Sequence, residues 1–219
     1  MFRRQLVTLT AAAAALCAMP AFAAQPGIQY KVLENPLPVP AGTLVKIYSY
    51  DCPFCFRYDT SVDPRILPRV EKEAGLKFMP IHLETRGRYG RTASEFFAMC
   101  MLRDEKAGIS IEDEASAFKK ARDAVYFAYH RRAERWTSGE AAFVNTMAEA
   151  SGISAEQFEK ERRSPEVVRL ADSWKAAQPV ARIQGIPAYV VNGKYLIMTR
   201  SIKGVNDMVE LIKELALLK

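Results

Sequence analysis

Two cysteines with two residues between them lie where a segment typical of a β-strand meets one typical of a helix. This constrains the chain more than any other feature. Residues 43–50 are rich in β-branched and aromatic side chains, which favour a strand. The motif Cys52-Pro53-Phe54-Cys55 follows directly and opens a helical pattern. A C-x-x-C motif in this position is typical of redox proteins, so catalytic redox use is favoured over a purely structural disulfide.

The start of a helix suits a reactive cysteine. There the sulfur of Cys52 faces unpaired backbone N–H groups and the positive end of the helix dipole. Both favour the thiolate and lower the pKa of Cys52. Cys55 lies one helical turn further on and is placed to act as the resolving thiol. Pro53 is tolerated because the first turn of a helix loses no hydrogen bond to a proline.

A zinc site is the main alternative use of two such cysteines. Zinc takes about four ligands, usually from a second C-x-x-C or a histidine pair. The remaining soft ligands, Cys100, His82 and His130, are irregularly spaced, so we expect neither a metal site nor a cofactor. Cys100 is predicted to be a buried, inert thiol, and the two histidines to be ordinary packed or surface residues.

The first 23 residues have the features of a secretory signal peptide. Arg3 and Arg4 precede an apolar run too short to span a bilayer, and Ala21-Phe22-Ala23 predicts cleavage after Ala23. Cleavage removes Cys17 and leaves three of the four cysteines. It also leaves 29 Lys and Arg against 25 Asp and Glu, so the net charge falls from +6 to +4. The exported protein is expected in the periplasm, where disulfides persist.

Export also governs how the positive charge is interpreted. The chain carries no recognised nucleic-acid-binding motif, so we expect no nucleic-acid partner. The arginine clusters are interpreted as solvated helix faces, with steering of clients toward the site as the alternative. The 49% of hydrophobic residues excludes a disordered chain, and 219 residues suffice for one domain with an insertion.

The rest of the chain predicts an α/β domain interrupted by helices. Beyond the motif the helical pattern runs to about residue 70, with breaks expected at Pro64 and Pro68. The elements predicted elsewhere are an extended arm at 25–40 with an edge strand at 30–33, a strand at 76–83, helices from 91 to about 177, including 118–136, 139–150 and 155–163, a hairpin at 188–198 and a closing helix at 205–218.

A proline begins the first strand of the predicted hairpin. Pro187 follows Ile186 in the run Gln184-Gly185-Ile186-Pro187, an unusual start for a strand unless a special loop is needed. Bonds before proline are the usual site of cis peptides, and we predict a cis Ile186–Pro187 bond. The exposed backbone of Ile186 could then pair with an extended substrate strand beside the cysteines.

These features together resemble the DsbA family of thiol–disulfide oxidoreductases, and most of all its DsbL branch. The resemblance covers nearly all of the mature chain, and the segments that carry it are 46–55, 78–85, 108–110 and 183–198. It implies a thioredoxin fold with an inserted helical domain. The expected divisions are a signal peptide at 1–23, the first part of the thioredoxin fold at 24–85, the helical insertion at 86–165 and the second part of the fold at 166–219.

The resemblance also implies an activity. A periplasmic dithiol oxidase of this kind donates the Cys52–Cys55 disulfide to folding exported proteins, with Cys52 as the exposed nucleophile, Cys55 as the resolving thiol and Pro187 as the cis-proline. A DsbB-like or DsbI-like membrane quinone reductase would reoxidise it. The DsbL branch implies a narrow clientele that includes an arylsulfate sulfotransferase. General DsbA enzymes have histidine where this chain has Phe54, so no imidazolium is available inside the motif.

Lys46 departs from a common pattern of the thioredoxin fold. Many such enzymes place a buried carboxylate on this strand, six residues before the first cysteine. A buried cation would favour a nearby thiolate, whereas a carboxylate would oppose it. We therefore hypothesise that Lys46 lies behind the two cysteines and makes the enzyme more oxidising. The alternative is a lysine whose charged end reaches solvent at the strand edge.

Two rival functions remain open from sequence. One is a disulfide isomerase or reductase on the same fold. Such isomerases are usually dimers with an added dimerisation module, for which the 25–40 arm is too short, so a monomer is expected. The other is a non-catalytic periplasmic metal-binding protein or chaperone that uses Cys52 and Cys55 as ligands. The redox potential of the Cys52–Cys55 couple separates the three functions.

Overall fold

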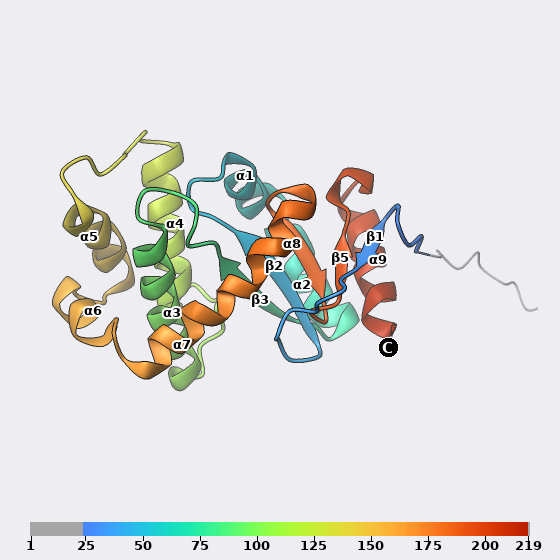
Figure 1. Ribbon diagram of the computed structural model, residues 1–219, viewed down its shortest axis with the longest axis horizontal. Helices are drawn as coiled ribbons and strands as arrows, with labels where there is room; N and C mark the ends of the chain where they lie inside the picture. The colour runs from blue at the N-terminus through green and yellow to red at the C-terminus, as the bar shows by residue number, and fades with distance from the viewer. Residues whose placement is uncertain (1–23, 219) are drawn as a thin grey trace, which may run out of the picture.

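The computed structural model describes residues 24–218, which form a five-stranded sheet with helices on both faces and a group of helices at one end (Figure 1). The strands are β1 (Tyr30–Val32), β2 (Thr43–Tyr48), β3 (Lys77–His82), β4 (Ala188–Val191) and β5 (Tyr195–Ile197). The helices are α1 (Pro53–Ser61), α2 (Asp63–Ala74), α3 (Gly90–Ala107), α4 (Ala117–His130), α5 (Glu140–Ser151), α6 (Ala155–Glu161), α7 (Pro165–Ser173), α8 (Ala177–Gln184) and α9 (Val205–Leu217). The predicted signal peptide and its cleavage site lie outside the described residues.

The strand order is β1-β5-β4-β2-β3, with β3 parallel to β2 and the other pairs antiparallel. All six residues of β2 are buried, because helices cover both faces of the central strand. Val45 and Ile47 pack into the core that continues into the helical insertion. Leu44 packs on the opposite face, against α2 and α9. The predicted α/β domain interrupted by helices is confirmed.

The outer strand β3 contains a proline that costs no hydrogen bond of the sheet. The N–H of Lys77 donates to the carbonyl of Gly42 across 2.8 Å, and that of Leu83 to Tyr48 across 2.9 Å. The backbone N–H and C=O groups of odd-numbered residues in this strand therefore point toward β2. Those of even-numbered residues point away from the sheet edge, toward the outside. Pro80 stands at an outward position, where an edge strand tolerates a missing N–H.

Two breaks are expected in the helix after the active-site motif, at Pro64 and at Pro68. Only the break near Pro64 is present. The break falls at Val62, and Pro64 lies in the first turn of α2. Pro68 lies inside α2, which continues to Ala74 instead of ending near residue 70. Gly75 then ends the helix in the left-handed region, at φ 66°, which glycine adopts at little cost.

Two other predicted boundaries are wrong for tertiary reasons. The helix predicted at 118–136 ends at His130, and Trp136 adopts a positive φ of 47° that turns its ring into a buried aromatic cluster. The helical pattern that starts at residue 91 predicts a last helix from about Pro165 to about residue 177. Instead α7 ends at Ser173, and a separate helix, α8, crosses one face of the sheet (Figure 1).

The helices α3 to α7 lie together beyond the β3 edge of the sheet (Figure 1). Among them α4 packs on both α3 and α5. The helix α7, which begins at the predicted boundary near residue 165, packs on α3 and so stays in contact with the insertion. The division into 24–85, 86–165 and 166–219 remains a prediction.

Candidate active site

The two cysteines of the motif lie where β2 gives way to α1. Cys52 is the residue that caps the N-terminus of α1, and its Sγ accepts the backbone N–H of Cys55 across 3.1 Å. Both are free thiols in the structure. Cys55 is fully buried, and Cys52 is only 3% exposed, so Cys52 is less exposed than the family resemblance implies.

The two thiols differ strongly in acidity. The pKa of Cys52 is lowered from 9.0 to about 7, first by the hydrogen bond from the Cys55 thiol and then by the backbone N–H groups of Cys55 and Phe54. The positive charge of Arg86 adds to this shift, and burial opposes it. Burial raises the pKa of Cys55, and the hydrogen bond to Cys52 raises it further. In the reduced pair the negative charge therefore resides on Cys52.

The predicted second half of the site meets the first. The Ile186–Pro187 peptide bond is cis, as predicted, and Pro187 is buried. The thiol of Cys52 lies 3.6 Å from the backbone carbonyl of Ile186, which can accept its hydrogen bond. The active-site motif and the proline loop, 134 residues apart in the chain, thus form one site.

Pro53 and Phe54 extend this site to the surface. Pro53 occupies the first turn of α1, as predicted. Phe54 is 56% exposed, and the guanidinium of Arg57 lies 4.9 Å from the centre of its ring. Phe54 therefore offers an apolar surface next to Cys52, in the position where the imidazole of general DsbA enzymes is expected.

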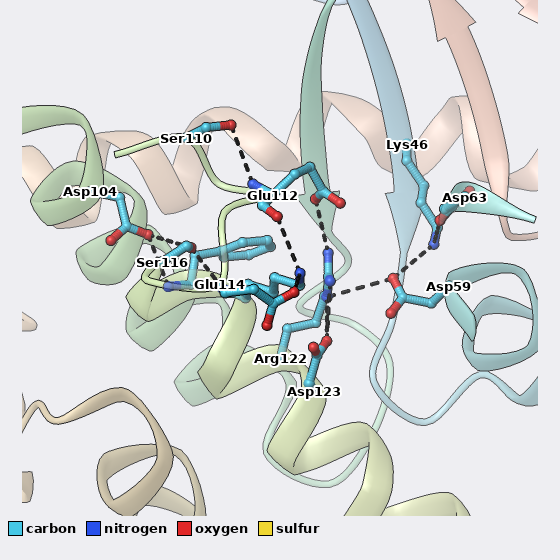
Figure 2. A network of polar contacts seen from close by, with 12 residues as sticks. Lys46, Asp59, Asp63, Asp104, Ser110, Glu112, Glu114, Ser116, Arg122 and Asp123 are labelled. Carbon is cyan, nitrogen blue, oxygen red and sulfur yellow. Dashed lines mark hydrogen bonds and ion pairs between the residues drawn. The ribbon is translucent and has the colours of Figure 1, made fainter. Parts of the chain in front are cut away.

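Lys46 is buried, not at the strand edge, and it does not stand alone. It is 2% exposed, and its Nζ bonds to Asp63 and lies 3.3 Å from Asp59. Figure 2 shows Lys46 reaching from β2 to these two carboxylates, which stand four residues apart on α1 and α2. Burial disfavours the ammonium, but the two carboxylates outweigh it, so the pKa of Lys46 is raised.

A second buried cation shares this network. Arg122 of α4 is 6% exposed and lies 3.5 Å from Asp59, 3.4 Å from Glu112 and 3.1 Å from Asp123 (Figure 2). The pKa of Asp59 is lowered because Arg122 and Lys46 outweigh the effect of its burial. Sequence reasoning singled out Lys46 but missed its partners. The spacing of Asp59 and Asp63, one helical turn apart, was the available signal.

Tyr50, two residues before Cys52, has a role in the site that no pattern in the sequence indicates. Its backbone N–H donates to Nε2 of His82 across 3.3 Å, and its ring stacks on that imidazole at 5.8 Å. Its hydroxyl accepts the N–H of Tyr89, and Nε2 of His130 lies 2.9 Å from its carbonyl. Both histidines are packed residues, as predicted, and both fix the segment that leads into Cys52.

Cys100 lies apart from this chemistry. It is fully buried in α3, and burial raises its pKa well above the usual thiol value. This agrees with the predicted inert thiol. Among residues 24–218, no three His, Cys, Asp or Glu side chains are grouped so that they could hold a metal ion. Within the same range, no helix has the length and apolar character needed to cross a membrane.

Comparisons with known proteins agree with this geometry. No protein-family model matches the chain. The thiol:disulfide interchange protein DsbL of Lelliottia amnigena is 49% identical over 213 residues, which cover 96% of this chain and 94% of that protein. The crystal structure of DsbL from Salmonella enterica serovar Typhimurium superposes with a TM-score of 0.85 at 48% identity, over 90% of this chain and 99% of that chain.

A more distant structure supports the fold alone. The DsbA disulfide interchange protein of Klebsiella pneumoniae superposes with a TM-score of 0.67 at 20% identity, over 89% of this chain and 96% of that chain. The predicted thioredoxin fold with an inserted helical domain is confirmed.

Proposed function

Since the chain belongs to the DsbL branch of the DsbA family and is a thiol:disulfide oxidoreductase, we propose that it is a periplasmic dithiol oxidase. It donates a disulfide between Cys52 and Cys55 to folding exported proteins. The observation that carries this proposal is the match to DsbL over nearly the full length of both chains, with Cys52 as the acidic thiol of the pair at the start of α1. A stabilised thiolate favours the reduced enzyme, which makes the disulfide form a stronger oxidant.

The reaction proceeds by two thiol–disulfide exchanges. A client thiolate attacks Sγ of Cys52, the Cys52–Cys55 bond breaks, and Cys55 leaves with the electron pair and takes up a proton. A second client thiolate then attacks the client sulfur of the mixed disulfide, and Cys52 leaves as the thiolate. The client loses two electrons and gains a disulfide, and the enzyme gains both electrons.

The backbone of Ile186 positions the client during the first exchange. Its carbonyl lies beside the sulfur that the client must reach. An extended client segment that hydrogen-bonds to this residue brings its cysteine to Cys52. Phe54 adds an exposed apolar contact at the same place.

Lys46, buried on β2, tunes the redox couple from the interior side of the cysteine pair. Its positive charge lowers the pKa of Cys55, although burial dominates the acidity of that thiol. Because Cys55 keeps its proton near neutral pH, the proposed rise in potential comes from the attraction of Lys46 for the negative charge that the reduced pair carries on Cys52. Its paired carboxylates reduce the size of this effect, because Asp59 and Asp63 place two negative charges beside it.

Membership of the branch supports a proposal for the clients and for the reoxidation partner. A narrow client set that includes an arylsulfate sulfotransferase is proposed, with reoxidation by a DsbB-like or DsbI-like membrane quinone reductase. The protein acts as a monomer. A comparison of rates tests the clientele: a reduced sulfotransferase should be oxidised faster than a reduced exported protein of another family. Equal rates would contradict the narrow client set.

The redox potential of the Cys52–Cys55 couple tests the oxidase function itself. It can be measured against glutathione buffers on a Cys100→Ser variant, which retains only these two cysteines after signal cleavage. We expect a value closer to about −120 mV, as for DsbA, than to about −270 mV, as for thioredoxin. A value near that of thioredoxin would favour a reductase, and tight stoichiometric binding of copper or zinc would favour the metal-binding alternative.

A further inference from the structure

A large cavity lies between α2, the outer strand β3 and the helical insertion. Its volume is about 1310 Å³, which exceeds the roughly 300–1,000 Å³ typical of small-molecule sites. Its lining includes Phe56, the residue after Cys55, and Lys77, Phe78 and Met79 of β3. The proposed reaction uses none of this surface.

The strand that borders the cavity has an unpaired edge. No strand within residues 24–218 pairs with the outer side of β3. Because the even-numbered positions face outward, the N–H and C=O of Phe78 and the C=O of Pro80 point away from β2. Phe78 and Met79 are only half-buried. An extended peptide can add to an edge of this kind through main-chain hydrogen bonds.

The wall opposite this edge carries unbalanced negative charge. The residues that line the cavity include six carboxylates and four cationic side chains, although the mature chain is positive overall. Within the wall, Arg122 faces Asp59, Glu112 and Asp123, and Lys46 faces Asp59 and Asp63, so two cations meet four carboxylates (Figure 2). A cationic ligand would complement this charge.

One residue that lines the cavity carries a buried hydroxyl without a partner in the described part of the chain. Tyr126 of α4 lines the cavity and is 1% exposed. Its hydroxyl has no hydrogen-bond partner among the described residues, 24–218. Buried polar groups normally have a partner, and leaving one unpaired costs about 1–3 kcal/mol.

We propose that this cavity binds an extended segment of a client protein, which pairs with the outer edge of β3 and places a lysine or arginine side chain among the carboxylates around Arg122. The edge selects an extended backbone, and the carboxylates select the charge. Because Phe56, the neighbour of Cys55 in the chain, also lines the cavity, the bound client stays near the cysteine pair. This second contact rests on the proposed oxidation of client proteins and lies outside the cysteine site.

The test uses a peptide without cysteine, so that disulfide exchange cannot contribute. The probe is a capped pentapeptide of alternating threonine and valine with a central arginine, titrated into reduced ¹⁵N-labelled protein. We expect saturable shifts of the Phe78 amide. The same peptide with norleucine in place of arginine should bind at least fivefold more weakly, as should the arginine peptide to a Glu112→Gln, Asp123→Asn variant.

Two substitutions at one position isolate the backbone contact. Phe78→Pro removes the outward N–H without removing a hydrogen bond to β2, whereas Phe78→Ala removes the ring and keeps the N–H. We expect at least tenfold weaker binding to the Phe78→Pro variant than to the Phe78→Ala variant. Equal binding to both, or equal binding of the norleucine peptide, would overturn the proposal. Self-association through this edge, seen by sedimentation and lost in Phe78→Pro, would replace the client with a second copy.

The redox potential keeps this result separate from the proposed oxidase function. Phe78→Pro should leave the potential of the Cys52–Cys55 couple unchanged. A normal potential with no peptide binding would refute the second contact alone. Peptide binding with a potential near that of thioredoxin would refute the oxidase alone.

Discussion

His130 donates a hydrogen bond from Nε2 to the backbone carbonyl of Tyr50 across 2.9 Å, which joins α4 to the segment before Cys52. A carbonyl can only accept, so this nitrogen carries the proton. On the other side of Tyr50, Nε2 of His82 accepts the backbone N–H, and Nδ1–H donates to Ser94 across 2.8 Å. Two histidines in opposite tautomers therefore hold one residue, and the geometry of the site depends on it.

The space around the Tyr50 ring predicts a destabilising substitution at Gly87. A Cβ at this position would lie 2.5 Å from the Tyr50 ring, and the φ of Gly87 is also positive, at 72°. The matched control is Gly108→Ala, which has a φ of 68° and nothing within 4 Å of the added Cβ. Both variants share the backbone cost of about 1–2 kcal/mol, and Gly87→Ala should lose about 1–3 kcal/mol more. Urea unfolding measures the difference, and equal losses would contradict the close contact.

Burial of His82 predicts a pH-dependent loss of stability. Burial lowers its pKa from 6.5 to about 3, so the unfolded chain binds a proton between these values that the folded protein does not. This contribution is complete above pH 6.5 and is lost as the pH falls from 6.5 toward 3, by up to about 1.4 kcal/mol per pH unit.

Urea unfolding at several pH values between 5 and 7 measures this slope. His82→Phe should be less stable at pH 7, because it leaves the Tyr50 N–H unpaired. Its stability should also depend less on pH than that of the wild type. An unchanged slope would show that another group is responsible.

The acidity of Cys52 predicts a change of slope in the redox potential near pH 7. Below its pKa of about 7 two protons accompany the two electrons, and above it only one, since Cys55 keeps its proton. The potential should therefore fall by about 59 mV per pH unit below pH 7 and by about 30 mV above it. A single slope from pH 5 to 9 would contradict the assigned pKa.

The buried pair of Lys46 predicts coupled effects on stability and thiol acidity. Lys46→Met leaves Asp59 and Asp63 without that cation, so we expect a loss of about 3–5 kcal/mol in stability. The thiolate absorbance of the cysteine pair should titrate at higher pH, and the potential should fall.

A double variant tests whether the charge causes this effect. Adding Asp63→Asn to Lys46→Met removes one cation and one anion together, and the titration should return toward that of the wild type. Lys77→Met, an exposed lysine on the neighbouring strand, is the control. An unchanged thiolate titration in Lys46→Met would refute the tuning role.

Cys100 should not react under native conditions. It is fully buried and its pKa is raised, whereas Cys52 is the acidic thiol. In the reduced protein, iodoacetamide should modify Cys52 at neutral pH and spare Cys100 until denaturant is added. Mass spectrometry of the digested protein locates the adduct, and early labelling of Cys100 would contradict its burial.

Local patterns in the sequence predict the parts of this protein that depend on local chemistry. The strand before Cys52, the helix start at Pro53 and the cis bond before Pro187 all agree with the structure. Each depends on a few neighbouring residues. The burial of Lys46 agrees with one of the two alternatives that its position in an apolar strand left open.

Contacts between distant segments are what sequence patterns missed. The helical pattern continues through Trp136, but the ring packs at 6.1 Å from that of Tyr50, and the helix ends before it. The carboxylates around Arg122 come from α1, α4 and the segment after α3, so no single pattern brings them together. Tertiary packing decides such cases over local propensity.

The contact between Cys52 and Ile186 has a consequence for biogenesis. A chain exported from its N-terminus delivers the cysteine pair long before the loop that completes the site, because 134 residues separate the two. For the proposed oxidase this means that the cysteine pair is exported before its site is complete. Donation to a client can begin only once the loop at Ile186 has reached Cys52.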